Sequence, residues 1–512
     1  MSANLVLIDH QRSLDIESVC LIARGKARLA LSDEPAFQQR IQRGADAVQD
    51  ALQGDPRIYG LTTGFGDSCD QVVAAASSAE LSRSIYTYHG CGTGALLDAA
   101  CTRATLLARL NSLARGFSGV RPVLLQRLSQ LIAHDILPLI PSEGSVGASG
   151  DLTPLSYVAA VLCGERSVHY RGEQRPAGDV LKALQIEPLQ LAAKEGLALM
   201  NGTAVMTGIA CLAWQRANYL SQLATRISAC MIGVMGARLD HYSETLFQAK
   251  PQPGPVRVAA RIRRDFGQHN GRAVRSRLQD PYSLRCSPHV IGTLEDSLPW
   301  LRGLIESELN SANDNPLLDP QTGEFLHGGH FYGGHIALAM DTLKATVANL
   351  ADLADRQMAV LVDPRYNKGL PANLAPPGAT NHGLKALQIA CSAWTAEALK
   401  LTMPASVFSR STECHNQDKV SMGTIAARDA MRVLQLSEQV MAACLIGVRQ
   451  AMYLQKLDSL MLPGAREMLD QLQQRIEPLA TDRALDADLQ ALMGDIAEQY
   501  WVLYADETGS ER

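Results

Sequence analysis

The sequence predicts a mainly α-helical protein, built as a long-helix bundle with a smaller, loop-rich N-terminal region. Long stretches of its second half carry apolar residues at helical spacing, over residues 212–234, 336–362 and 424–453. Residues 59–94 and 138–150 are instead rich in Gly, Ser, Thr and Pro, which is typical of loops. Because loops give way to long helices near Asn201, we expect an N-terminal region over residues 1–200 and a bundle over residues 201–512.

Shorter elements are expected before the long helices. Residues 6–8 resemble a short strand, and the helical spacing of Ile16, Val19, Leu21 and Ile22 predicts a helix directly after it. Two further helices are predicted over residues 106–117 and 122–134.

The longest apolar stripe predicts a helix over residues 336–362, which would be about 40 Å long. The stripe steps by three or four residues and ends before Asp363–Pro364; its members are Ile336, Met340, Leu343, Val347, Leu350, Ala354, Met358 and Leu361. Such a helix needs partners for its apolar face, so we expect a bundle, formed in part between subunits.

Composition excludes several classes of protein. The chain of 512 residues is 46% apolar and 19% charged with a net charge of -5, which is typical of a soluble globular protein and not of a nucleic-acid or polybasic membrane-binding protein. The N-terminus lacks the pattern of a secretory signal, and no apolar run is expected to span a bilayer. The eleven cysteines form no Cys-x-x-Cys pair, which fits a reducing compartment. We therefore expect a cytoplasmic protein.

Metal and pyridoxal phosphate are not expected as cofactors. His327, His330 and His335 lie close in sequence, but glycines separate them and no cysteine joins them, which argues against a metal site. No lysine loop with a phosphate-binding context is apparent. The glycines of residues 90–94 follow no β-branched run, so a dinucleotide fold is not expected either.

The residues Ala148, Ser149 and Gly150 carry unusual chemical potential. Gly150 lacks a Cβ, so its nitrogen can approach the carbonyl carbon of Ala148 and close a five-membered ring. Loss of water, including the Ser149 hydroxyl, would leave a methylidene-imidazolone, an electrophile that no ordinary side chain supplies. Taken alone, the same triplet fits a flexible glycine loop, or a helix N-cap formed by Ser149 or Asp151.

The context of this triplet resembles the histidine, phenylalanine and tyrosine ammonia-lyase family over nearly the whole chain. The matching segments stand in the family's order: Tyr59–Gly66, Asn111–Gly119, Ala148–Gly150, Asn201–Thr203, Gln279–Cys286, Asn313–Pro316 and Asn416–Gly423. The resemblance implies a homotetramer whose active sites are shared between subunits, an imidazolone formed autocatalytically from Ala148, Ser149 and Gly150, and helix N-termini aimed at it.

The resemblance also implies roles for other residues. Tyr59 matches the loop tyrosine that removes the β-hydrogen, which requires a lowered pKa or a proton relay. Arg285 matches the arginine that binds the substrate carboxylate, a task suited to a guanidinium fork. Asn201 and Tyr282 match residues beside the electrophile. The resemblance places the remaining candidates around the substrate: Tyr88, His89, Phe331, Glu413, Asn416 and Gln417.

The pair Tyr88–His89 stands where the family selects its substrate ring. Histidine lyases resemble Ser-His there, tyrosine lyases His-Leu and phenylalanine lyases Phe-Leu, so this pair matches none of them cleanly. Gln417 is similar to the phenylalanine and tyrosine lyases, because histidine lyases have a glutamate there. His330 departs from the asparagine that usually precedes Phe331. His89 can bond a ring hydroxyl or an imidazole, or be a buried histidine that reads no substrate.

The expected activity is the elimination of ammonia from an aromatic L-amino acid to give an arylacrylate, with no nucleic-acid or membrane partner. L-Tyrosine or a ring-hydroxylated relative is favoured over L-phenylalanine, and both over L-histidine. The alternatives are a histidine ammonia-lyase that gives urocanate, an aromatic 2,3-aminomutase, and a helical scaffold without catalysis.

Overall fold

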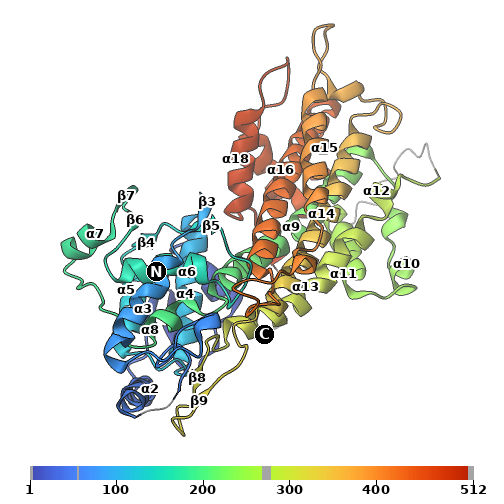
Figure 1. Ribbon diagram of the computed structural model, residues 1–512. Helices are drawn as coiled ribbons and strands as arrows, with labels where there is room; N and C mark the ends of the chain where they lie inside the picture. The colour runs from blue at the N-terminus through green and yellow to red at the C-terminus, as the bar shows by residue number, and fades with distance from the viewer. Residues whose placement is uncertain (1–3, 55–56, 268–277, 506–512) are drawn as a thin grey trace. The chain divides into compact units, whose positions relative to one another are not determined.

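The computed structural model describes residues 4–54, 57–267 and 278–505, and it confirms a mainly α-helical protein (Figure 1). The chain forms two compact units. Unit 1 comprises Met1–Gln215, Arg302–Asp341 and Pro404–Arg428, and unit 2 comprises Arg216–Leu301, Thr342–Met403 and Asp429–Arg512. The predicted division of the chain after residue 200 stays a prediction.

Unit 1 combines helices with small β-sheets. Its helices are α1 (Ile16–Ala23), α2 (Pro35–Gln53), α3 (Ser78–Tyr88), α4 (Ala99–Ala114), α5 (Pro122–Ala133), α6 (Leu152–Leu162), α7 (Ala177–Ala183) and α8 (Glu195–Met200). Its strands are β1 (Asn4–Ile8), β2 (Ala27–Leu31), β3 (Thr93–Leu96), β4 (Leu137–Pro138), β5 (Pro141–Glu143), β6 (Ser167–Tyr170), β7 (Glu173–Pro176), β8 (Leu317–Leu318) and β9 (Phe325–Leu326). β1 and β2 pair in parallel, while β3–β5, β4–β6–β7 and β8–β9 pair antiparallel.

The longest helices contribute residues to both units: α9 (Ala204–Met235), α13 (Ser287–Leu309), α14 (Gly334–Leu361) and α16 (Gly423–Gln455). The predicted stripe on α14 is confirmed, since all of its members from Ile336 to Leu361 are buried. Unit 2 further contains α10 (Glu244–Gln248), α11 (Pro253–Phe266), α12 (Tyr282–Arg285), α15 (Lys385–Lys400), α17 (Arg466–Arg475) and α18 (Asp486–Ala497).

Helix α16 is long and apolar enough to cross a bilayer by length and composition, which corrects the expectation that no run qualifies. Of its most apolar window, 78% is buried inside the protein. A core helix shows this property, because its apolar face is covered by other parts of the chain. The cytoplasmic location stays a prediction.

The N-terminal half holds more regular structure than we predicted. Residues 59–94 were expected to be loop, but residues 78–88 form α3. Its buried face contains Ser78 and Ser82 beside Ile85 and Tyr86, so small hydroxyl residues occupy positions where apolar residues would reveal a helix. Ser82 Oγ donates to Ala192 O at 2.8 Å, which explains why a serine is tolerated in this face. Helix α4 likewise begins before the predicted residue 106, at a cap in which Asp98 accepts from Cys101 N.

An ion pair without solvent contact lies in the core of unit 1. Lys194 Nζ lies 2.5 Å from Asp314 Oδ2, and both side chains are fully buried. Arg109, also buried, donates from Nη1 to Asn313 O at 3.3 Å and from Nη2 to Ala198 O. The segment around Asn313 is therefore fixed to the region just before α9.

Removing one partner of the Lys194–Asp314 pair is expected to destabilise the protein strongly. Lys194→Met or Asp314→Asn should each lower the free energy of unfolding by about 3–5 kcal/mol, because the remaining group is left buried without its partner. The measurement is urea unfolding at one fixed protein concentration. Glu397→Gln, which breaks the exposed Arg432–Glu397 pair, is the control and should cost less than about 1 kcal/mol. Equal losses in core and control variants would contradict this account.

Candidate active site

The loop at Ala148, Ser149 and Gly150 has a backbone shape that requires glycine. Ser149 and Gly150 have φ angles of 50° and 79°, in the left-handed region. Gly150 pairs with Gly202 through an isolated β-bridge, and a Cβ on Gly150 would lie 2.2 Å from Gly202 O. The missing Cβ thus allows two chain segments to touch, and it brings the triplet next to Asn201.

Asp151 fixes this loop to the start of α9. Its Oδ2 accepts from the backbone N–H groups of Val205 and Met206 at 2.9 and 3.0 Å, and its Oδ1 accepts from Thr424 at the start of α16. Burial raises the pKa of Asp151 to about 6, although these hydrogen bonds favour the carboxylate. Asp151 was predicted only as a possible cap and Thr424 was not predicted; the available signals were a polar residue directly before α6 and a threonine in the first turn of α16.

Helix N-termini gather at the loop, as the family resemblance implied. α6 begins at Leu152, directly after the triplet. A Cβ on Gly147 would lie 2.2 Å from Ser421 Oγ and 3.4 Å from Gly423 N, where α16 begins. Such termini carry partial positive charge, which favours negative charge developing at the loop.

Asn201 and Gln417 present amide groups at the loop. Gln417 Nε2 donates to Ser149 Oγ at 3.2 Å, while Gln417 Oε1 accepts from Thr412 Oγ1 at 3.0 Å. Asn201 is 2% exposed and donates weakly to Asn315 O at 3.5 Å. Its buried Oδ1 has no hydrogen-bond partner. The glycine cradle at Gly150 fits an imidazolone formed from Ala148–Gly150, and the unpaired Asn201 oxygen beside it is open to a donor such as a substrate amine.

Tyr59 lies on a tight loop that is joined to Glu413. Its hydroxyl accepts from Gly66 N at 2.8 Å, and both carboxylate oxygens of Glu413 lie 3.0 Å from Asp67 N. Burial raises the pKa of Tyr59, and the Glu413 carboxylate adds to this, while the Gly66 N–H opposes it. The lowered pKa that would suit a base is thus not present in this state, and the phenol keeps its proton.

Tyr88 and His89, here called the ring pair, lie at the end of helix α3, with ring centroids 4.6 Å apart. Burial lowers the pKa of His89 to about 4, so the imidazole is neutral at neutral pH. Burial raises the pKa of Tyr88 to about 12, with smaller contributions from the charges of Tyr59 and Glu413. Tyr88 and Tyr59 therefore both lie close enough to Glu413 for its charge to raise their pKa values.

A family model described as aromatic amino acid lyase matches residues 14–474. The chain belongs to the aromatic amino acid lyase family. Histidine ammonia-lyase of Geobacillus sp. (strain WCH70) is 37% identical over 456 residues, which cover 88% of this chain and 89% of that protein. Tyrosine aminomutase from Streptomyces globisporus matches with a TM-score of 0.89 and 31% identity over 97% of each chain. Histidine ammonia-lyase from Trypanosoma cruzi matches with a TM-score of 0.87 and 28% identity, over 97% of this chain and 94% of that one.

Membership makes the protein a carbon–nitrogen lyase and removes the scaffold alternative. The relatives' names do not agree on one substrate ring, so they establish the aromatic amino acid lyase class without the substrate. The lyase fold itself is confirmed by the solved neighbours, which match nearly the whole chain.

Phe331 lies in the turn before α14, and Asn416 lies in the turn that leads to Gln417. Phe331 is half-buried in the turn before α14. Gly333, two residues later, packs against Met206 of α9 so closely that a Cβ there would lie 2.2 Å from the sulfur. Asn416 is exposed and its N–H donates to Glu413 O at 2.9 Å, within the turn that leads to Gln417.

Tyr282 and Arg285 lie in unit 2, on the short helix α12. The Arg285 guanidinium carbon is 4.5 Å from the centre of the Tyr282 ring, and Arg285 Nε donates to Asp280 O at 3.1 Å. Tyr282 is 71% exposed. The structure thus places these two residues beside each other, and their roles in the lyase site stay predictions.

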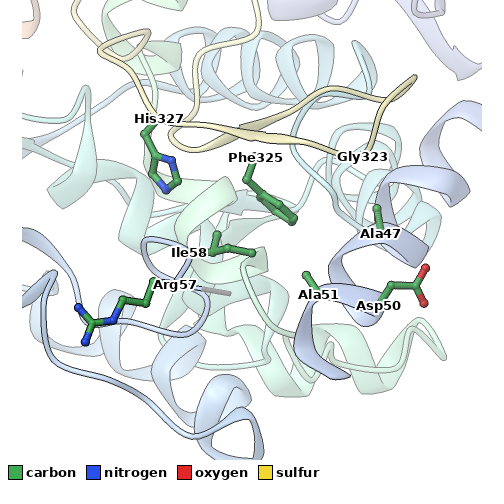
Figure 2. A pocket seen from close by; sticks show the side chains of 8 residues that line it. All are labelled: Ala47, Asp50, Ala51, Arg57, Ile58, Gly323, Phe325 and His327. Carbon is green, nitrogen blue, oxygen red and sulfur yellow. The ribbon is translucent and has the colours of Figure 1, made fainter. Parts of the chain in front are cut away.

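A cavity of about 480 Å³ lies beside the tyrosine loop of the lyase (Figure 2). Its lining residues come from α2, from the start of the tyrosine loop and from the β8–β9 hairpin: Ala47, Asp50, Ala51, Arg57, Ile58, Gly323, Phe325 and His327. Tyr59 N donates to His327 Nε2 at 3.3 Å, so the cavity adjoins the back of the loop and none of its lining residues is a predicted site residue. In the part of the chain that the structure describes, no group of three His, Cys, Asp or Glu side chains is arranged to hold an ion.

Gly150→Ala is expected to destabilise the lyase by about 3 kcal/mol, because overpacking against Gly202 O adds to left-handed backbone strain. Gly172→Ala is the matched control: its φ is 86°, but no atom lies within 4 Å of the added Cβ, so it should cost only about 1 kcal/mol. Urea unfolding of both variants measures the difference. Equal losses would show that the close approach of Gly150 to Gly202 contributes nothing.

Proposed function

We propose that this lyase eliminates ammonia from an aromatic L-amino acid, with L-tyrosine or a ring-hydroxylated relative preferred and L-phenylalanine second. The product would be the corresponding α,β-unsaturated arylacrylate. The observation that carries the choice of ring is the neutral imidazole of His89 beside Tyr88. A neutral imidazole can donate to or accept from a phenolic hydroxyl, and a site built around such a bond rejects analogues that lack the hydroxyl.

The proposed electrophile is the methylidene-imidazolone of Ala148, Ser149 and Gly150, which when formed supplies a carbon acceptor for the substrate amine and turns ammonia into a better leaving group. The amide of Gln417 supports this assignment because its Nε2 can donate beside the ring, and the unpaired Asn201 Oδ1 can accept from the substrate amine. The helix N-termini at Leu152 and Gly423 would favour negative charge that develops there.

Proton removal from the β-carbon is assigned to Tyr59. Its hydroxyl oxygen accepts from Gly66 N, so a tyrosinate at this position would keep one hydrogen-bond donor. Because burial raises the pKa of Tyr59, the phenol must pass its proton to a neighbouring group before it can act. Glu413, which adds to that shift, is the carboxylate we place nearest to this transfer. Arg285 is assigned to the substrate carboxylate and Phe331 to the ring pocket.

A second candidate function is the deamination of L-histidine to urocanate. It is favoured by relatives named histidine ammonia-lyase, such as that of Anaeromyxobacter sp. (strain K), which is 36% identical over 96% of this chain and 98% of that protein. Against it stands Gln417, whose neutral amide is bonded to Ser149 and Thr412 and has no charge to offer an imidazolium. An aminomutase is the third candidate, since a solved neighbour is a tyrosine aminomutase.

We also propose a homotetramer with shared active sites. Several large apolar side chains are exposed in the single chain, on segments that include α13, α15 and the residues before α16: Trp300, Ile389, Leu399, Met403, Val407 and Phe408. Exposed apolar side chains of this size are commonly covered by subunit contacts. The predicted site residues Glu413, Asn416 and Tyr282 are also exposed, which supports sites completed by a neighbouring subunit.

Ser149→Ala is expected to abolish activity, because no methylidene can form without the serine hydroxyl. The loss should be at least about a thousandfold in kcat, since removal of a covalent catalyst leaves only binding and electrostatic effects. Intact-mass spectrometry should show the water losses of ring formation in the wild type. Normal turnover by the variant, or an unmodified wild-type mass, would overturn the imidazolone.

Product formation from L-tyrosine, L-DOPA, L-phenylalanine and L-histidine should show a preference for the hydroxylated rings. His89→Phe is expected to lower the ratio of kcat/KM for L-tyrosine over L-phenylalanine by about tenfold or more. Since His89 stays neutral above its pKa of about 4, the wild-type ratio should be constant with pH from about 6 to 9 as far as this group is concerned. Urocanate as the main product, or an unchanged ratio, would reject the proposed ring choice.

A further inference from the structure

The end of helix α3 is held by groups from α6 and the turn that follows it. Arg166 Nη2 donates to Tyr86 O at 2.8 Å, within the last turn of α3. Ser156 Oγ accepts from Arg166 Nη1 at 3.1 Å, and its one proton lies between Thr153 O at 2.7 Å and His89 O at 3.3 Å. Carbonyls at a helix C-terminus lack partners inside the helix, so these donors fix the backbone that carries the ring pair.

The Arg166 guanidinium fills a space shaped around it. Its central carbon lies 4.1 Å from the centre of the Tyr157 ring, a cation–π arrangement. A Cβ added to Gly90 would lie 2.2 Å from Nη2, so the guanidinium would have to move to admit a side chain directly after His89. The positive charge also stands at the C-terminal end of α3, where the helix dipole favours a cation.

Arg166 adopts a backbone conformation that does not suit arginine. Its φ is 63°, in the left-handed region, which costs about 1–2 kcal/mol for a residue with a Cβ. Glycine would adopt this conformation without strain. This strained arginine has a side chain that bonds Tyr86 O and Ser156 Oγ and lies over the Tyr157 ring. Such contacts point to a role for the side chain, since strain persists where surrounding contacts compensate for it.

The neighbouring residue adds a second clamp on α3. Glu165 Oε1 accepts from Tyr86 Oη and from Arg83 Nη2, both at 3.1 Å. The turn at residues 165–166 thus holds α3 through its side chains and through its last carbonyls. Residues Ala148–Gly150, which would form the proposed electrophile, are here called the electrophile loop. Because α6 begins at Leu152, just after this loop, one helix connects the loop to Glu165 and Arg166, which bond to α3.

We propose that Arg166 is a specificity-positioning residue, which fixes Tyr88 and His89 at a set place relative to the electrophile loop. Arg166 does not touch the substrate in this role and acts only through the end of α3. The inference rests on the proposed function, in which that pair reads the substrate ring. A small displacement of a hydrogen-bonding group weakens discrimination between rings more than it weakens elimination itself.

The test compares Arg166→Gly with Arg171→Gly in the full-length enzyme. Arg166→Gly removes the side chain and relieves the backbone strain, so the variant is expected to fold. Arg171 is a matched control: it has a φ of 52° and lies over the Tyr170 ring at 5.0 Å, but it is exposed in the turn between β6 and β7. The readout is the ratio of kcat/KM for the two best amino acids of the wild type. This ratio is independent of how much enzyme is folded.

Arg166→Gly should move this ratio towards one by roughly tenfold, mainly through the KM of the preferred substrate, while Arg171→Gly keeps the wild-type ratio. Arg166→Lys, which keeps the charge but lacks the two-pronged donor, should fall between them and serves as the test if the glycine variant does not fold. A wild-type ratio in Arg166→Gly, or in Arg166→Lys where that variant stands in, overturns the inference.

The same measurements separate this inference from the proposed function. If His89→Phe changes the ratio and Arg166→Gly does not, the ring pair selects the substrate but Arg166 does not position it. If neither variant changes the ratio, both the positioning role and the assignment of the ring pair fail. If both variants change it, the positioning role is supported.

Discussion

The buried carboxylate of Asp151 is the interaction on which the arrangement of the site depends. It accepts from two N–H groups that open α9 and from the hydroxyl of Thr424 at the start of α16, while its own backbone N–H donates to Gly202 O. Burial makes an isolated carboxylate costly, as its raised pKa shows, and the helix dipole of α9 offsets that cost. The electrophile loop, which ends directly before Asp151, is thereby tied to the starts of two helices distant in the sequence.

Long helices were predictable from the sequence because burial repeats every three or four residues along them. The stripe from Ile336 to Leu361 is buried throughout, and its ends agree with the prediction within two residues. Helix α3 was not predictable in the same way, since Ser78 and Ser82 occupy its buried face. A serine reveals a helix only when its hydroxyl partner, here Ala192 O, is known, and that partner is brought near by tertiary packing.

The candidate site could be predicted where chemistry is written in neighbouring residues and not where it depends on contacts across the chain. The three adjacent residues Ala148, Ser149 and Gly150 contain all the atoms of the proposed ring, so the triplet itself suggests the chemistry. In contrast, the family resemblance placed Gln417 and Glu413 around the substrate, but it did not predict their contacts with Ser149 and Asp67, which are more than half the chain away. The direction of the pKa shift of Tyr59 was also not predictable. Burial and the Glu413 carboxylate raise this pKa, and neither is visible from a tyrosine in a loop sequence.

The choice of ring cannot be assigned to two residues taken alone. Proteins named histidine ammonia-lyase and tyrosine aminomutase share this fold with the chain at about a third identity, so the shared framework admits different rings. Tyr88 and His89 can read a substituent only at the distance at which α3 holds them from the loop. That distance is set by α6, which starts beside the loop, and by Arg166, which donates to Tyr86 O in the last turn of α3. A ring pair that matches no known pattern must therefore be interpreted together with the residues that position it.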